Sequence, residues 1–174
     1  MSGGSRRSWG WHPLVDRWAE RVVADAGVRA GELVVDLGAG RGALTRHLVR
    51  AGARVLAVEL HPGRAAYLRE RFADAPVTVV SADAREVRLP GRPYRVVASP
   101  PYGISSALLR RLLGPRSQLV AADLVLQRAL VRRWIGHNRR WELRAGTDLP
   151  RRAFAPPPTV DSTVLVVRST RRPR

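Results

Sequence analysis

The chain has 174 residues, of which 45% are hydrophobic, and this is enough for one domain with a sizeable core. It has no cysteine, which excludes a disulfide framework and a thiolate metal site, and it has no apolar run of membrane-spanning length. There are 31 basic residues, all arginine, against 14 acidic ones, so the net charge of +17 predicts a polyanionic partner, nucleic acid rather than a membrane surface.

Strand and helix patterns alternate along the chain. Apolar residues at helical spacing predict a helix over 13–26, ended by Gly27. Short apolar runs predict strands over 33–37, 54–58, 77–80, 95–98, 119–126 and 160–167. Helical patterns between them predict helices over 43–49, 63–72, 104–113 and 128–135. This alternation is typical of a parallel, doubly wound α/β sheet.

A glycine-rich loop follows the first predicted strand, with the sequence Asp36-Leu37-Gly38-Ala39-Gly40-Arg41-Gly42. Glycines here allow a tight turn and let a ligand approach the backbone. Glu59 ends the second strand at the spacing of an acid that binds a ribose diol, and Asp83 follows the third, near an expected adenine amino group. The G-x-G-x-G spacing after an acid favours S-adenosylmethionine (SAM) over a dinucleotide.

Each acid also has a simpler interpretation. Asp36 could cap a helix or a turn, Glu59 could be a solvated strand end, and Asp83 could cap a helix that begins near Ala84. Their joint occurrence at the ends of three successive strands favours the cofactor site.

Residues Ser99-Pro100-Pro101-Tyr102 follow the fourth predicted strand. Two prolines cannot continue a central strand, because neither donates to the ladder, so they form a stiff turn. Ser99 supplies a hydrogen-bonding group and Tyr102 a flat aromatic face, which together can hold a planar base by its edge and its face. Alone, the tetrapeptide could be an ordinary proline-rich turn; the glycine loop favours a catalytic site.

With both motifs placed, the chain resembles the ribosomal RNA adenine N6-methyltransferases, which include the Erm macrolide-resistance enzymes and the KsgA-type dimethyltransferases. Gly10-Trp11-His12-Pro13-Leu14 is similar to the family's G-Q-[NH]-F-L segment, with departures at Trp11 and Pro13. Residues 154–162 are similar to its F-x-P-x-P-x-V-D-S hairpin, and residues 99–102 to its N-[IP]-P-[YF] motif, with Ser99 in place of asparagine.

The resemblance implies a Rossmann-like, class I SAM-dependent methyltransferase fold: a mostly parallel seven-stranded sheet with helices on both faces and a C-terminal antiparallel hairpin. We expect this domain over 10–168, between a flexible basic segment, 1–9, and an arginine-rich tail, 169–174. The chain looks like a short, single-domain Erm that lacks the family's helical C-terminal RNA-binding domain.

The implied activity is SAM-dependent transfer of methyl to N6 of adenine in 23S rRNA, conferring macrolide–lincosamide–streptogramin B resistance. The implied catalytic residues are Ser99, Pro100 and Tyr102. The cofactor contacts expected from the loop, the strand ends and the resemblance are His12, Leu14, Asp36, Gly38, Gly40, Glu59, Leu60, Asp83, Ala84 and Ser99. We expect a cytoplasmic monomer that acts on 23S rRNA or a large-subunit precursor, holds no metal and, because of Ser99, adds mainly one methyl group.

Some interpretations stay open. The chain could instead methylate N6 of adenine in DNA, methylate a protein, or be a non-catalytic ribosome-binding assembly factor. The cluster Arg132-Arg133-Trp134, His137 and Arg139-Arg140-Trp141 is typical of single-stranded RNA binding, but its tryptophans could equally be core residues. Trp9 and Trp11 could form a cofactor lid or contact RNA.

Overall fold

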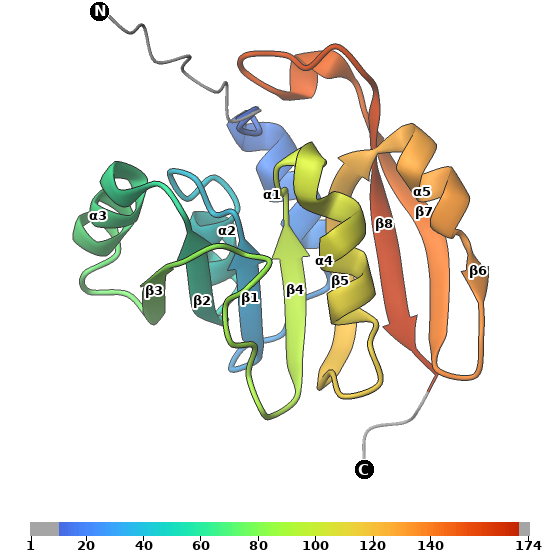
Figure 1. Ribbon diagram of the computed structural model, residues 1–174. Coiled ribbons are helices and arrows are strands. Elements are labelled where there is room, and N and C mark those ends of the chain that lie inside the picture. Colours follow the sequence, from blue (N-terminus) through green and yellow to red (C-terminus); the bar gives the residue numbers. More distant parts are fainter. Residues whose placement is uncertain (1–10, 171–174) are drawn as a thin grey trace, which may run out of the picture.

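One mixed sheet organises the chain (Figure 1). The computed structural model describes residues 11–170. The eight strands lie in the order β3-β2-β1-β4-β5-β8-β7-β6. They are β1 (Leu33–Leu37), β2 (Arg54–Glu59), β3 (Val77–Ser81), β4 (Tyr94–Ala98), β5 (Leu119–Gln127), β6 (Gly136–His137), β7 (Trp141–Leu149) and β8 (Ser162–Ser169). Strands β1 to β5 pair in parallel, and β8, β7 and β6 are antiparallel.

The expected fold is therefore confirmed, with seven strands of five or more residues and the two-residue β6 added at one edge. The C-terminal hairpin is formed by β7 and β8, and residues 154–161 belong to its connection. The apolar pattern of the sequence predicts a strand at the position of β8 but none at the position of β7.

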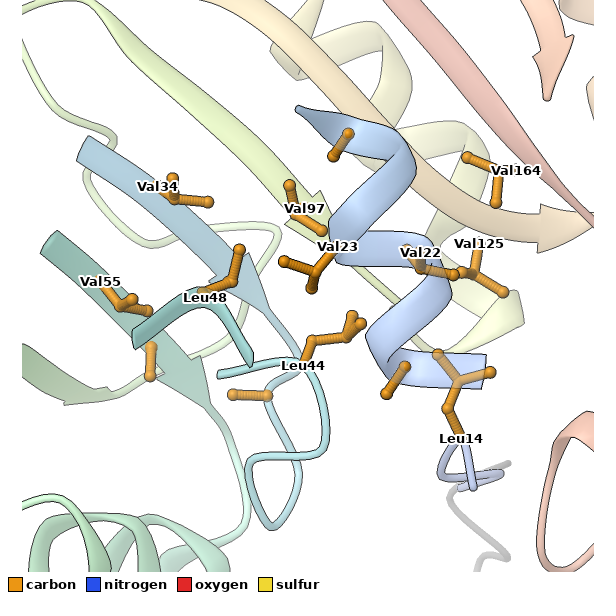
Figure 2. Packing of buried hydrophobic residues seen from close by; sticks show 14 of the residues in the cluster. Leu14, Val22, Val23, Val34, Leu44, Leu48, Val55, Val97, Val125 and Val164 are labelled. Atoms are coloured by element: carbon orange, nitrogen blue, oxygen red, sulfur yellow. The ribbon is translucent and has the colours of Figure 1, made fainter. Parts of the chain in front are cut away.

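Helices cover both faces of the sheet. They are α1 (Asp16–Ala26), α2 (Thr45–Arg50), α3 (Pro62–Arg71), α4 (Ser105–Leu112) and α5 (Arg128–Trp134), with short 3-10 turns η1 (Tyr102–Ile104) and η2 (Arg151–Ala153). Residues of α1, α2 and α3 belong to one buried cluster, and those of α4 and α5 to a second cluster on the opposite face. Figure 2 shows Val23 of α1 beside Val97 and Leu44, and Val22 of α1 beside Val125, in the first cluster. None of the helices over residues 11–170 is long and apolar enough to cross a membrane.

The first helix is shorter than its apolar pattern predicts. It begins at Asp16 rather than at residue 13, because residues 13–15 pair with the other end of the chain. Val15 N–H donates to the Ala153 carbonyl (2.9 Å), Ala155 N–H donates to the Pro13 carbonyl (3.0 Å), and Leu14 forms a bridge with Phe154. The helix ends as predicted at Gly27, whose φ of +62° is left-handed.

A buried ionic cluster ties α1 to the sheet. The Arg95 guanidinium donates to the carbonyls of Ala26 and Gly27 at the C-terminus of α1 and to the Glu32 carboxylate. It also lies 3.9 Å from a carboxylate oxygen of Asp123, a side chain only 2% exposed. Arg168 donates to both oxygens of Asp123, at 3.0 and 3.1 Å. Asp123 is thus shared between two guanidinium groups, although burial raises its pKa.

Candidate active site

One cavity, of about 170 Å³, lies at the carboxyl ends of the parallel strands. This is where open α/β sheets bind their ligands. Every site residue predicted from the sequence lines it: His12, Leu14, Asp36, Gly38, Gly40, Glu59, Leu60, Asp83, Ala84, Ser99, Pro100 and Tyr102. Gly10 and Trp9 lie outside the described residues.

The glycine loop and the proline turn both line the cavity, and they lie in close contact with each other. Gly38 has a φ of +78°, and a Cβ on it would lie 3.1 Å from Cδ of Pro101 and 3.5 Å from Cα of Pro100. Gly40 has a φ of +60°, and a Cβ there would lie 2.9 Å from Nε1 of Trp11. Glycine is therefore favoured at both positions for two reasons: the left-handed backbone conformation, and the lack of space for a Cβ.

Glu59 anchors the loop from β2. Its side chain is 5% exposed; Oε2 accepts from Gly40 N–H (2.8 Å), and Oε1 accepts from His61 N–H (2.9 Å). Arg64 Nε and Nη2 also donate to Oε1, at 3.2 and 3.1 Å, and the Arg64 guanidinium lies 4.9 Å from the Trp11 ring. The interpretation of Glu59 as a solvated strand end is therefore wrong, since it is buried and holds four donors.

Asp36 lies beneath the loop and is 1% exposed. Its Oδ2 accepts from the Thr45 hydroxyl at 2.8 Å. The pKa of Asp36 is raised to about 7, mainly by burial and in part by the negative charge of Glu59, whereas the hydrogen bonds from Thr45 limit the rise. The side chain therefore connects the end of β1 to the first turn of α2.

Asp83 is paired within its own turn. Its carboxylate accepts from Arg85 N–H (2.8 Å) and from the Arg85 guanidinium, whose Nη2 lies 2.6 Å away. These hydrogen bonds hold the pKa of Asp83 below its usual value. The segment after Asp83 forms turns and not a helix, so the interpretation as a helix cap is wrong.

Tyr102 is held from both ends of the described chain. Its hydroxyl lies 2.5 Å from Oγ of Ser162, the fully buried serine of the F-x-P-x-P-x-V-D-S segment. The His12 ring lies 6.2 Å from the Tyr102 ring, at an interplanar angle of 24°. His12 Nδ1 lies 2.9 Å from the Pro156 carbonyl. The N-terminal segment and the C-terminal motif therefore meet around the aromatic ring that follows the proline turn.

Part of the arginine–tryptophan cluster is structural. Trp141 is 2% exposed and donates its Nε1–H to the Leu113 carbonyl, so of its two interpretations the core position is the one that holds. The Arg140 guanidinium lies over the Trp141 ring and donates to the carbonyls of Gly114, Pro115 and Ser117. Trp134 is partly buried against the second core cluster. Trp141 and Arg140 are therefore structural, whereas Arg132, Arg133 and Arg139 of the same cluster are exposed.

Sequence reasoning missed three arginines at the cavity, Arg41, Arg64 and Arg85. Arg64 lies five residues after Glu59, in the first turn of α3, and Arg85 lies two residues after Asp83. These short spacings are the signal by which each arginine could have been paired with its acid. Arg41 carries no such signal.

Comparisons with known proteins agree with this geometry. An "rRNA methyltransferase" of Streptomyces thermotolerans is 38% identical over 97% of this chain and 60% of its own length. "Mycinamicin-resistance protein MyrB" of Micromonospora griseorubida is 35% identical over 98% of this chain and 58% of its own. The crystal structure of 23S rRNA methyltransferase ErmE superposes with a TM-score of 0.81 at 31% identity, over 92% of this chain and 71% of that one.

The chain thus spans about three fifths of the length of these two curated relatives. The sequence profile of the family described as "Ribosomal RNA adenine dimethylase" matches residues 5–174, so the chain belongs to the ribosomal RNA adenine dimethylase family.

Proposed function

We propose that the chain transfers methyl groups from SAM to N6 of adenine in 23S rRNA, and that this modification confers macrolide-type resistance. The observation that carries the proposal is the proline turn with Tyr102, which contacts the glycine loop across a single cavity. The similarity to a mycinamicin-resistance protein and to ErmE supports the choice of substrate. Such a substrate, alone or in a large-subunit precursor, places the reaction in the cytoplasm.

The residues of the cavity fit SAM. Gly38 and Gly40 both line the cavity, and their lack of a Cβ lets the loop lie close to Pro101 and Trp11, which line it as well. Oε2 of Glu59 has one protein donor and keeps a lone pair for a ribose hydroxyl, whereas Oε1 becomes available only when Arg64 moves away. We assign Leu60 and Ala84 to the faces of the cofactor's adenine and Asp83 to its amino group.

SAM supplies a methyl group on a sulfonium ion. The chain's own task is to orient the attacking nitrogen, because the N6 lone pair of adenine is delocalised into the ring. We assign the Ser99 hydroxyl and the Pro100 carbonyl as acceptors of the N6–H bonds, which aims the lone pair at the methyl group. The proline pair keeps these acceptors rigid.

Tyr102 is assigned to stack on the target base after the base leaves its helix. Stacking of a base on an aromatic side chain contributes roughly 1–3 kcal/mol. Ser162 and His12 fix the ring in place, so little side-chain freedom is lost when the base arrives.

The test is incorporation of tritiated methyl from SAM into 23S rRNA, 16S rRNA, DNA and protein in parallel. Label in 23S rRNA, with a primer-extension stop at the drug-site adenines in cells that express the protein, is the expected result. Tyr102→Ala should lose most of the incorporation and still bind SAM. Label only in DNA or protein, or SAM binding without label in any substrate, would overturn the proposal.

Mass spectrometry of the digested product gives the number of methyl groups. We expect mainly N6-methyladenosine, because Ser99 has a shorter side chain and a single hydroxyl where the family has an asparagine amide. Mostly dimethyladenosine would contradict this expectation and leave the assignment of the substrate intact.

A further inference from the structure

Two arginines flank one aromatic ring at the edge of the cavity. The Arg41 guanidinium, from the glycine loop, lies 4.6 Å from the centre of the Tyr67 ring, and that of Arg71 lies 5.9 Å from it. Arg71 Nη1 donates to the Arg41 carbonyl at 3.1 Å and to the Tyr67 hydroxyl at 3.4 Å. The three side chains therefore form one unit, built by α3 and the loop that contacts the proline turn.

The unit is held in place from below. The Arg71 guanidinium also lies 5.4 Å from the centre of the Phe72 ring. A Cβ on Gly42, which has a φ of +87°, would lie 2.7 Å from Cε2 of that same ring. The glycine loop thus rests directly on Phe72, and it is held both by Arg71, the last residue of α3, and by Phe72, which follows that helix.

The positive charges of the unit are not neutralised. Arg64 and Arg85, which also line the cavity, are paired with Glu59 and Asp83. Arg41 and Arg71 are exposed, and neither forms an ion pair with a carboxylate anywhere in residues 11–170. A pair of guanidinium groups left without a carboxylate at the edge of a binding cavity favours an anionic ligand.

The chemistry of the unit selects the kind of anion. A guanidinium over an aromatic face, as that of Arg41 is, can still donate its in-plane N–H groups, and this planar fork matches the oxygens of a phosphate. Arg71 uses Nη1 within the unit and has Nε and Nη2 left to donate. SAM carries no phosphate group, so a phosphate beside this cavity would come from the nucleic acid strand that carries the target base.

We propose that Arg41, Tyr67 and Arg71 form a docking site for the phosphodiester backbone of the RNA next to the target adenine. The inference rests on the proposed function, because it takes the substrate to be RNA. It assigns part of the large positive charge of the chain to one specific surface beside the reaction.

The test measures the dissociation constant of the full chain for a 23S rRNA hairpin that contains the drug-site adenines, as a function of KCl concentration. Arg41→Gln and Arg71→Gln should each weaken binding roughly five- to tenfold at about 0.1 M salt and lower the salt slope by about 0.7–0.9. The matched control is Arg69→Gln, which removes the same charge from an exposed position of the same helix. Arg69 contacts no aromatic ring in the described part of the chain, and its variant should change affinity less than twofold.

Two tyrosine variants separate stacking from charge. Tyr67→Phe keeps the ring and should bind the hairpin within about twofold of the parent, whereas Tyr67→Leu should lose affinity as an arginine variant does. Calorimetric SAM affinity of Arg71→Gln should match that of the parent, which shows that the variant is folded.

Equal losses for Arg69→Gln and Arg71→Gln would overturn the inference, since the effect would then be one of net charge alone. Failure of the proposed function looks different: the unaltered protein would label none of the RNAs with methyl. Binding that depends on Arg41 and Arg71 would still support a docking site for a phosphodiester chain.

Discussion

Replacing Gly38 by alanine should separate the cost of backbone strain from the cost of disturbing the proline turn. The left-handed φ of +78° costs an alanine about 1–2 kcal/mol. The added Cβ would also lie 3.1 Å from Cδ of Pro101, a ring that cannot rotate away, and such overpacking adds roughly 1–3 kcal/mol. We expect Gly38→Ala to lower the free energy of unfolding by about 2–5 kcal/mol in urea denaturation.

A matched control is available at Gly31. Its φ is +83°, but a Cβ there would meet no atom within 4 Å, so Gly31→Ala should cost only the strain of about 1–2 kcal/mol. In methyl-transfer assays Gly38→Ala should lose roughly tenfold in kcat, because a few tenths of an ångström at Pro101 misplace the acceptors of the proline turn. Gly31→Ala should keep the parent kcat. Equal stability losses and equal kcat values for the two variants would refute the claim that the loop positions the turn.

Three further predictions concern buried polar groups. Because the pKa of Asp36 is about 7 when folded and 3.8 when unfolded, the folded chain holds a proton that the unfolded chain releases, so stability should fall as pH rises through this window. Asp36→Asn should remove up to roughly 4 kcal/mol of that pH dependence, as measured by urea denaturation from pH 4 to 8. Ser162→Ala removes the partner of the Tyr102 hydroxyl and should raise the KM for RNA about fivefold, a loss near 1 kcal/mol, without changing SAM affinity in calorimetry. Arg95→Met leaves Asp123 with one guanidinium and the C-terminus of α1 uncapped, and should cost roughly 3–5 kcal/mol of unfolding free energy; a loss under about 1 kcal/mol would show that Arg168 alone suffices.

The parallel half of the sheet and β8 could be predicted from the sequence, whereas β7 and β6 could not. Strands β1, β2, β4 and β5 are short apolar runs bounded by turns, and their pattern does not depend on what they pack against. Strand β7 contains Gly146, which ordinarily interrupts a strand. The glycine is explained by packing against the neighbouring strand, because a Cβ at Gly146 would lie 2.8 Å from the Val166 side chain of β8. The register between β7 and β8 also shifts just beyond Ala145.

The cavity itself was predicted nearly in full, because parallel strands bring their carboxyl ends to one edge of the sheet. What the sequence could not reveal is how the acids are already engaged. The hydrogen bonds of Glu59 with Arg64, and the stacking of Arg64 beside Trp11, depend on where the chain before α1 crosses the loop. That crossing is fixed by pairing with residues near Phe154, far away in the sequence.

The support of Tyr102 from His12 and Ser162 has a consequence for how the protein matures. The glycine loop, Glu59 and the proline turn all lie within the first two thirds of the chain. The ring gains its hydroxyl partner only when β8 has been synthesised and inserted between β5 and β7. The support of Tyr102 thus depends on segments from both parts of the described chain: residues 13–15 must pair with residues 153–155, and β8 must take its place in the sheet.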